Sequence, residues 1–430
     1  MKLQGLRWWI IGLIALATII NYIDRSAINI LWPYIYKDFG VADANSKNAL
    51  ALITTFFMIA YAVGQTVFGK IMDALGTKLG FVLSIVVWSI SIALHSLAKS
   101  LNSFGFFRFF LGFGESGNWP GATKSNAEWF PAKERAIAQG IFGAGASLGS
   151  VVAAPFIAVL YLSVGWQGTF IGIAALGFLW VIPWLIINKA TPDKHPWITE
   201  NEKQYILDIP SKQTSVGTEI KVYSWRELLR FKNTWGIILS RFFIDPVWWL
   251  FVTWLPTFLK EQFSFDLKAV GAFAWMPYLL AAIGGLMGGY FSSYQIRKRV
   301  EAVKARKLAI KIGASIMLVA LSLIAFLLDG LKANPSLAIA LIGATLFGFQ
   351  FIINNIQTLP SDYFNGKNVG VVSGMGGTAA IIGVLITTWM VPTLTKTSYV
   401  SFFILAASLV PLSIIALYVF RDKKTKIKTE

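Results

Sequence analysis

The chain has 430 residues, of which 56% are hydrophobic and only 14% are charged. A soluble domain carries about 25% charged residues, so the composition predicts an integral membrane protein of the all-α class. The net charge of +17 does not indicate nucleic-acid binding, because the basic residues lie between apolar segments and form no single patch. Cysteine is absent and histidine occurs only at His95 and His195. This excludes thiol catalysis and argues against a metal cluster or a Ser-His triad, so we expect no metal and no cofactor.

Apolar segments of about 20 residues, the length that spans a bilayer as a helix, recur along the whole chain. The first follows Lys2 and Arg7 as a signal peptide would, but it lacks a small-x-small cleavage site, so we expect an uncleaved span. In all we predict twelve transmembrane helices, at residues 8–33, 48–69, 79–98, 102–122, 135–161, 167–188, 234–259, 268–292, 308–328, 336–358, 367–391 and 398–420.

The basic residues alternate in density between the predicted loops. If the N-terminus is cytoplasmic, most of the 38 basic residues fall in cytoplasmic loops and tails. The opposite loops then hold only Lys37, Lys47, Lys99, Lys260, Lys268, Lys332 and Lys396. This asymmetry predicts that both termini are cytoplasmic.

The longest polar stretch divides the spans six and six. We therefore predict an N-terminal six-helix bundle at 1–188, a cytoplasmic linker at 189–233, and a C-terminal bundle at 234–430 with a basic tail. Thr199 precedes Glu202 by three residues, and Ser224 precedes Glu227 by three. Both are capping-box patterns, so we expect two short amphipathic helices in the linker. We expect His95 at a membrane interface and His195 in a solvated loop.

Glycines recur at close helical spacing in three spans, which is typical of helix backbones packed closely within a membrane. The clusters are Gly140, Gly143, Gly145 and Gly149; Gly284, Gly285, Gly288 and Gly289; and Gly370, Gly374, Gly376 and Gly377.

Charged residues occur inside three spans, where each costs roughly 2.5–3.5 kcal/mol even on the most lenient insertion scale. In "NYIDRSAIN", the adjacent Asp24 and Arg25 point about 100° apart and so do not simply neutralise one another. In the fourth span, Arg108, Gly112, Glu115 and Trp119 fall on one face of a continuous helix. The seventh span carries Arg241 and Asp245, at a spacing that allows them to pair with each other.

Two arginines that face a polar cavity suit an anion, because a guanidinium stays charged and grips a carboxylate through two parallel hydrogen bonds. A carboxylate in the same cavity changes protonation according to what else is bound. We therefore predict that Arg25 and Arg108 bind an anion and that Asp24 and Glu115 carry protons. The alternative is a set of structural ion pairs between helices, which is the favoured interpretation of Arg241 and Asp245.

Aromatic and amide side chains suit a polyhydroxylated ligand, which needs hydrogen-bonding groups beside a flat apolar ring. Interhelical hydrogen bonding and interfacial anchoring are the alternative roles for each. The candidates are Tyr61, Asn118, Trp248, Trp249, Gln350, Asn354, Asn355 and Gln357, with Asp245 as a further candidate.

The stretch "GKIMDALGTK", between the second and third spans, resembles the signature loop of the major facilitator superfamily. It keeps Gly69, Asp73, Gly76 and Lys78 but has Ala74 where a basic residue is usual. The corresponding stretch of the second half, "GGYFSSYQIRKR", keeps the glycine and the basic end but not the acidic residue.

Other motifs resemble one branch of that superfamily, the anion:cation symporters. They are "YIDR", "GFGESGNWPGATK" and "AEWFPAKERAIAQGIFGAGASLG". Within this branch, the stretch from Thr234 to Pro246 and "LKAVGAFAWMPYLLAAIGGLMGGY" resemble hexuronate transporters, which import glucuronate and galacturonate with protons.

The resemblance implies two six-helix bundles related by an axis along the membrane normal, with the binding site at their interface. It also implies that Arg25 and Arg108 meet the substrate carboxylate, that Asp24 and Glu115 carry the protons, and that Tyr61 joins the site. We therefore expect a monomeric, proton-coupled symporter of the bacterial inner membrane, with a sugar-acid anion, protons and the bilayer as its partners.

Three alternatives stay open. In the first, the substrate is another organic anion, such as an aldonate, an aldarate or an unsaturated uronate. In the second, the chain is a membrane-embedded enzyme or receptor, but the missing cysteines and the lack of a sizeable extramembrane domain argue against this. In the third, the chain is a drug/proton exporter, although arginines that face a cavity suit a cationic drug poorly.

Overall fold

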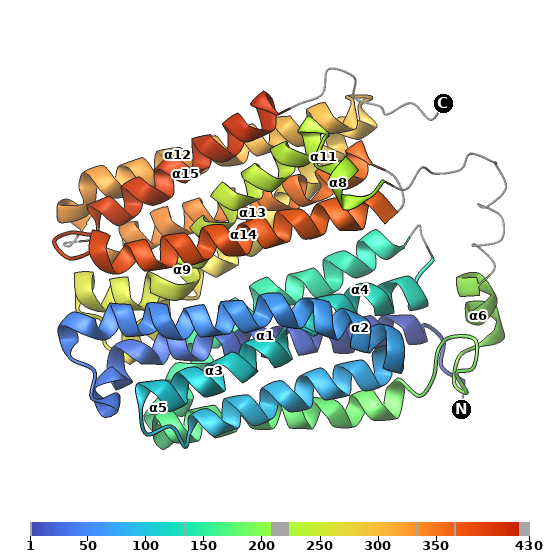
Figure 1. Cartoon of the computed structure of the whole chain (residues 1–430), viewed down its shortest axis with the longest axis horizontal. Coiled ribbons are helices and arrows are strands. Elements are labelled where there is room, and N and C mark those ends of the chain that lie inside the picture. The colour runs from blue at the N-terminus through green and yellow to red at the C-terminus, as the bar shows by residue number, and fades with distance from the viewer. Residues whose placement is uncertain (1, 132–133, 208–222, 332–333, 365–366, 421–430) are drawn as a thin grey trace. The chain divides into compact units, whose positions relative to one another are not determined.

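The computed structural model describes residues 2–131, 134–207, 223–331, 334–364 and 367–420. Within these ranges the structure is helical, with one isolated β-bridge between Leu3 and Ile198. The chain divides into two compact units, Met1–Gly217 and Thr218–Glu430, and the boundary falls inside the predicted linker. Figure 1 shows the helices of both units.

Unit 1 contains long helices joined by short turns. Its helices are α1 (Leu6–Ile35), α2 (Ser46–His95), α3 (Leu101–Glu115), α4 (Asn118–Trp129), α5 (Arg135–Ile187) and α6 (Glu200–Leu207), with short 3₁₀ turns at Tyr36–Phe39 and Asp43–Asn45. Within the unit, α1 packs along α5 and α2 packs along α3.

Unit 2 begins with a single helical turn and continues with membrane-length helices. Its helices are α8 (Trp225–Leu228), α9 (Lys232–Phe263), α10 (Leu267–Phe273), α11 (Met276–Arg297), α12 (Ala302–Leu331), α13 (Pro335–Tyr363), α14 (Lys367–Leu394) and α15 (Val400–Val419). Here α13 packs against both α11 and α12, while α9 packs against α14 and α15.

The twelve predicted segments are all helical, but their boundaries differ from the prediction in two ways. The second and third spans are two helices that meet at Gly76 within α2, and the fifth and sixth are two helices that meet at Gly165 within α5; at both glycines the backbone leaves the helical conformation. Both glycines have positive φ, 78° and 70°, a conformation that only glycine adopts at little cost. The fourth span is interrupted between α3 and α4 at Ser116–Gly117, and the eighth between α10 and α11 at Ala274–Trp275, although these residues keep right-handed helical φ and ψ. By length and composition, nine helical stretches of the described residues could cross a membrane, because each pair of helices that meets at a glycine counts once and α3 and α4 are too short to count.

Large apolar side chains remain exposed on the surface of each helical unit. Phe326 is 88% exposed and Leu286 is 74% exposed. A soluble protein rarely exposes contiguous apolar surface on this scale, so these side chains are suited to contact lipid.

Seven of the twelve glycines in the predicted clusters lie within 4 Å of a neighbour in the described structure. A side chain at Gly145 or Gly149 on α5 would meet backbone carbonyls of α1 at 2.7 and 2.6 Å, and one at Gly288 on α11 would meet Phe351 of α13 at 2.6 Å. Close backbone packing therefore requires glycine there. Other members of the clusters have no described atom within 4 Å of such a side chain, so helix packing does not explain them: Gly140, Gly143, Gly289, Gly370 and Gly374.

The linker helices differ from each other in how they begin. The Ser224–Glu227 pair forms the reciprocal capping box that was predicted, at the start of α8. At α6, Thr199 Oγ1 accepts from the N–H of Glu202 at 3.4 Å, but the Glu202 carboxylate does not return to Thr199. It binds the start of α1 instead.

The prediction that His195 is solvated was wrong, whereas the interfacial position expected for His95 stays a prediction. His95, at the end of α2, is fully buried between Phe104 and Phe170, and its Nδ1 lies 2.7 Å from the carbonyl oxygen of Ser91. His195 is only 4% exposed because it fits against the end of α5.

Candidate functional site

An ion pair joins α1 to α3 in the interior of unit 1. Arg25 Nη2 and Nε donate to Glu115 Oε2 at 2.9 and 3.0 Å, and Arg25 Nη2 also donates to Asn21 Oδ1 at 3.3 Å. The Arg25 side chain is 3% exposed and that of Glu115 is fully buried. Sequence analysis placed both residues in the site but did not foresee that they pair with each other.

Arg108 lies next to this pair and is only partly satisfied. Its Nη2 donates to the backbone oxygen of Arg25 at 3.0 Å, which ties α3 to α1 a second time. Its Nε and Nη1 have no hydrogen-bond partner among the described residues, although the residue is 3% exposed. Buried polar groups in folded proteins nearly always have partners, so two free N–H donors are what a binding site for an acceptor would offer.

Asp24 is buried in the same part of unit 1 and likewise lacks partners. It is 1% exposed, and neither of its carboxylate oxygens has a hydrogen-bond partner among the described residues. A buried carboxylate that accepts no hydrogen bond is costly as an anion. A proton at Asp24 would remove that cost by removing the charge.

Aromatic rings surround both guanidinium groups. The Arg25 guanidinium carbon lies 4.9 Å from the ring centre of Tyr61, 5.0 Å from that of Tyr22 and 5.2 Å from that of Phe57. The guanidinium carbon of Arg108 lies 4.7 Å from the Phe57 ring. These cation–π contacts hold the arginines in a site with little water, and they place Tyr61 beside Arg25.

The approach of α3 to α2 depends on small residues near the charges. A side chain at Gly114 would meet the backbone nitrogen of Trp88 at 2.6 Å, and one at Gly112 would collide with the carbonyl of Phe57. Ser84 Oγ donates to the carbonyl of Gly114 at 2.7 Å. This close contact between α2 and α3 thus fixes α3, and with it the positions of Arg108 and Glu115.

Ser116 and Gly117, which separate α3 from α4, keep right-handed helical φ and ψ. Trp119 lies on α4, where its ring packs edge-on against Phe142 of α5 at 5.5 Å. The continuous face expected from Arg108 to Trp119 stays a prediction. Asn118 begins α4 and donates to Thr18 Oγ1 of α1 at 3.1 Å, while its Oδ1 has no partner among the described residues.

In unit 2, Arg241 and Asp245 pair along α9. Arg241 Nη2 and Nε contact the two carboxylate oxygens of Asp245 at 2.9 and 3.1 Å. This is the bidentate geometry that arginine and a carboxylate favour. The i,i+4 pairing foreseen for these residues is present.

An aromatic cluster and several amides lie nearby in unit 2. Trp248 stacks on Phe349 with ring centres 5.4 Å apart and meets the edge of Tyr278 at 5.7 Å. Sequence analysis missed Tyr278, and a lone tyrosine in an apolar span gave no signal of this contact. Trp249 and Gln350 are half-buried.

The two asparagines of α13 differ in exposure. Asn354 is exposed and donates to the carbonyl of Gly285 at 3.3 Å. Asn355 is buried, and its Nδ2 donates to Phe351 at 2.8 Å and to Gly288 of α11 at 3.2 Å. Its Oδ1 has no partner among the described residues. Both side chains thus join α13 to α11.

The predicted signature loop is the bend of α2. Asp73 pairs with Lys124 of α4 at 2.8 Å, and Lys124 Nζ also donates to the carbonyl of Met72 at 2.7 Å. Gly76 supplies the bend, and Lys78 Nζ reaches the carbonyl of Lys189 at 3.3 Å. Gly69 has open space around it in the described structure. Lys124, which sequence analysis did not single out, is thus the partner of the acidic residue in this motif.

The fold and the buried charges describe a multi-pass helical membrane protein with an ionic core in unit 1. The sequence matches the model of the Major Facilitator Superfamily over residues 14–379, and the chain belongs to this family. It is therefore a membrane transporter and not an enzyme.

Similar proteins agree with this assignment. The chain is 34% identical to the hexuronate transporter of Escherichia coli K12, over 88% of this chain and 85% of that protein. It is also 34% identical to the galacturonate transporter of Dickeya chrysanthemi, over 74% of this chain and 90% of that protein. The crystal structure of a D-xylose–proton symporter has the same fold, with a TM-score of 0.74 at 13% identity over 98% of both chains.

Proposed function

We propose that this transporter is a symporter that carries a hexuronate, such as glucuronate or galacturonate, together with protons by alternating access. The observation that carries the proposal is the buried Arg108, which keeps two unpartnered N–H donors beside the Arg25–Glu115 ion pair. The similarity to relatives named for hexuronate and galacturonate transport supports the choice of substrate.

Arg108 and Arg25 are assigned to the substrate carboxylate. Nε and Nη1 of Arg108 have no partner among the described residues, and each of them forms, together with Nη2, a pair of parallel donors of the kind that a carboxylate accepts. Arg25 is held by Glu115 in the described structure. A proton on Glu115 would weaken this pair and free Arg25 for the substrate, so proton and anion would bind together.

Asp24 is assigned to the second proton position, because its carboxylate is buried without partners. Tyr61 would contact the sugar beside Arg25, and Asn118 Oδ1 is a further acceptor in unit 1. In unit 2, the residues assigned to recognition of hydroxyl groups are Trp249, Gln350, Asn354, Asn355 and Asp245.

Proton coupling is also favoured by energetics. An anion that enters against an inside-negative potential faces about 2.3 kcal/mol per 100 mV, and one co-transported proton cancels that charge. A second proton would let the potential itself drive uptake. In this proposal the protein lies in the bacterial inner membrane as a monomer with both termini in the cytoplasm.

The proposal is tested with purified protein in proteoliposomes, with labelled glucuronate and an imposed pH gradient, acidic outside. We expect accumulation in the lumen, together with acidification reported by an entrapped dye. Accumulation that is indifferent to the gradient would refute the coupling. A competition panel of aldonates, aldarates and unsaturated uronates then identifies the substrate, and a stronger competitor than either hexuronate would replace them.

Glu115→Gln tests the proton assignment within the same assay. Glutamine keeps the shape and one acceptor oxygen but cannot take up a proton, so we expect loss of gradient-driven accumulation. Counterflow exchange, which needs no net proton movement, should persist. Retention of gradient-driven accumulation in this variant would contradict the role of Glu115.

A further inference from the structure

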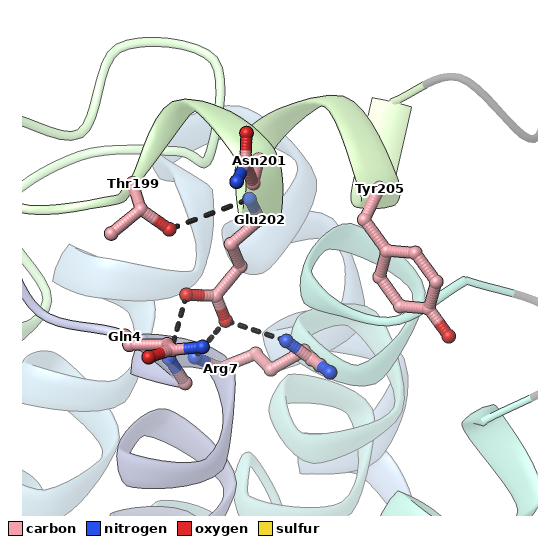
Figure 2. A pocket seen from close by; sticks show the side chains of 7 residues that line it. Gln4, Arg7, Thr199, Asn201, Glu202 and Tyr205 are labelled. Atoms are coloured by element: carbon pink, nitrogen blue, oxygen red, sulfur yellow. Dashed lines mark hydrogen bonds and ion pairs between the residues drawn. The ribbon is translucent and has the colours of Figure 1, made fainter.

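The Glu202 carboxylate of α6 caps a helix that begins nearly 200 residues earlier. It accepts from the backbone N–H groups of Gly5, Leu6 and Arg7 at 2.9, 3.1 and 3.2 Å. Figure 2 shows Glu202 beside Arg7. The first N–H groups of an α-helix have no partner within the helix, and α1 has no side-chain cap at its own Gly5. A negative charge is also favourable at a helix N-terminus. Glu202 thus supplies both the acceptors and the charge that α1 lacks locally.

Arg7 forms ion pairs with residues of both α6 and the start of α5. Its Nη1 contacts Glu202 Oε1 at 2.8 Å, and its Nε contacts Glu134 Oε2 at 3.1 Å. Glu134 is the residue before α5, and its other oxygen accepts from Tyr205 of α6 at 2.7 Å. The Glu202 side chain is 4% exposed and that of Arg7 is 15% exposed. Three elements that are distant in sequence therefore meet in one largely buried ionic cluster.

Further hydrogen bonds join the start of the chain to the residues before α6. Leu3 and Ile198 form a parallel β-bridge, Leu3 N–H donates to the carbonyl of Trp197 at 2.7 Å, and Lys2 Nζ donates to that of Ile198 at 2.8 Å. A shallow pocket of about 250 Å³ lies over this junction, and Arg7, Glu202 and Tyr205 line it (Figure 2). The chain start and the first linker helix are thus folded onto each other within unit 1.

We propose that Glu202 is a positioning residue that makes helix α6 a fixed part of unit 1 and holds the start of α1, the helix that carries Asp24 and Arg25. Alternating access requires each bundle to move largely as a rigid body. The cluster of Glu202, Arg7 and Glu134 would keep α1, α5 and the start of the linker together during that movement. The transport part of this inference rests on the proposed function, whereas the structural part does not.

The primary test compares Glu202→Gln with Glu200→Gln, which removes the same charge from an exposed position on the same helix. Loss of the carboxylate should raise amide hydrogen exchange at residues 5–7 at least tenfold, measured in detergent without substrate. Glu200→Gln should leave this exchange unchanged. Arg7→Gln provides an independent variant if Glu202→Gln does not fold.

The second measurement is the uptake rate, because a purely local structural role of Glu202 would leave this rate unchanged. In Glu202→Gln we expect the maximal uptake rate to fall at least threefold, while the dissociation constant for glucuronate stays within twofold of wild type. Glu202→Asp, which keeps the charge, should recover part of the rate. If glucuronate is not the substrate, the amide exchange still reports on the cluster, so failure of one proposal is distinguishable from failure of the other.

A disulfide tests whether the junction stays closed during transport. The chain has no native cysteine, so Leu3→Cys with Ile198→Cys gives a single defined pair. Paired strands lie about 4.8 Å apart, which is within reach of a disulfide. We expect the oxidised pair to transport at the wild-type rate and to restore the rate of Glu202→Gln. Blocked transport in the oxidised pair, or an equal effect of Glu200→Gln and Glu202→Gln on exchange and rate, would overturn the proposal.

Discussion

At the scale of single residues, the two buried arginines of unit 1 differ in what their hydrogen-bonding groups do. Arg25 is engaged by Glu115 and Asn21, whereas Arg108 uses one nitrogen on a backbone carbonyl and leaves two N–H donors free among the described residues. In the proposed function, Arg108 is therefore available to the anion at once, while Arg25 becomes available through Glu115. The same residue type has two duties because its neighbours differ.

This difference predicts that Arg108 needs the guanidinium shape as well as its charge. In Arg108→Lys the charge remains but the fork of two parallel donors is lost, so we expect the dissociation constant for the anionic substrate to rise at least tenfold. Isothermal titration calorimetry on the purified protein measures this change. The exposed Arg299→Lys is the matched control and should bind like wild type. Equal affinity in both variants would remove Arg108 from the anion site.

At the scale of elements, His195 closes the end of α5. Its Nε2 lies 2.8 Å from the carbonyl oxygen of Ile187, and its Nδ1 accepts from the N–H of Trp197 at 3.2 Å. A neutral ring with its proton on Nε2 satisfies these two shorter contacts, while the N–H of Lys189 lies at 3.3 Å from the same nitrogen. A second proton on Nδ1 would face the N–H of Trp197, which is itself a donor. Burial lowers the pKa of His195, and the charges of Lys189 and Lys78 act in the same direction.

The depressed pKa predicts a loss of stability in acid. The pKa of an unfolded histidine is about 6.5, so the unfolded state takes up this proton before the folded state does as the pH falls. The stabilisation from neutral His195 is thus complete above about pH 6.5 and declines toward the lower folded pKa. We expect the melting temperature of wild type to fall more between about pH 7.5 and 5.5 than that of His195→Asn, which cannot titrate. Parallel curves for the two proteins would show that His195 does not contribute.

Helix content and the charged positions followed from the sequence because hydrophobic length and intramembrane charge are strong local signals. Boundaries followed less well, since the helices of the second and third spans, and those of the fifth and sixth, extend through the predicted loops and meet at one glycine with positive φ. The interaction partners of the charged residues were the hardest feature to predict from the sequence. The spacing of Thr199 and Glu202 matches a local capping box, yet Glu202 reaches α1, and the Arg25–Glu115 pair joins residues 90 positions apart. Such pairings depend on tertiary packing, which a local pattern does not encode.

At the scale of the whole molecule, each unit contains an ion pair that joins two of its helices, but the two pairs join different helices. Unit 1 joins α2 to α4 through Asp73 and Lys124 at 2.8 Å. Unit 2 joins α12 to α13 through Arg306 and Asp362 at 3.4 Å, and Arg306 also donates to Ser292 of α11 at 2.8 Å. Ser292 of "GGYFSSYQIRKR" thus accepts a hydrogen bond from Arg306, whereas the acid of the ion pair, Asp362, comes from α13. Each unit keeps an ion pair, although only the first keeps the sequence motif.

The distribution of basic residues over the whole chain predicts its orientation, and the absence of cysteine makes this testable. Since positively charged loops are retained in the cytoplasm, single cysteines at Ala44 and Lys396 should react with a membrane-impermeant maleimide applied to intact cells. Cysteines at Lys194 and Lys298 should react only after the membrane is opened. All four side chains are exposed in the structure, so a lack of labelling in intact cells reports sidedness rather than burial. The reverse pattern would invert the topology and place the Glu202 cluster outside the cell, whereas labelling of only one residue of each pair would mean that the two units do not share one orientation.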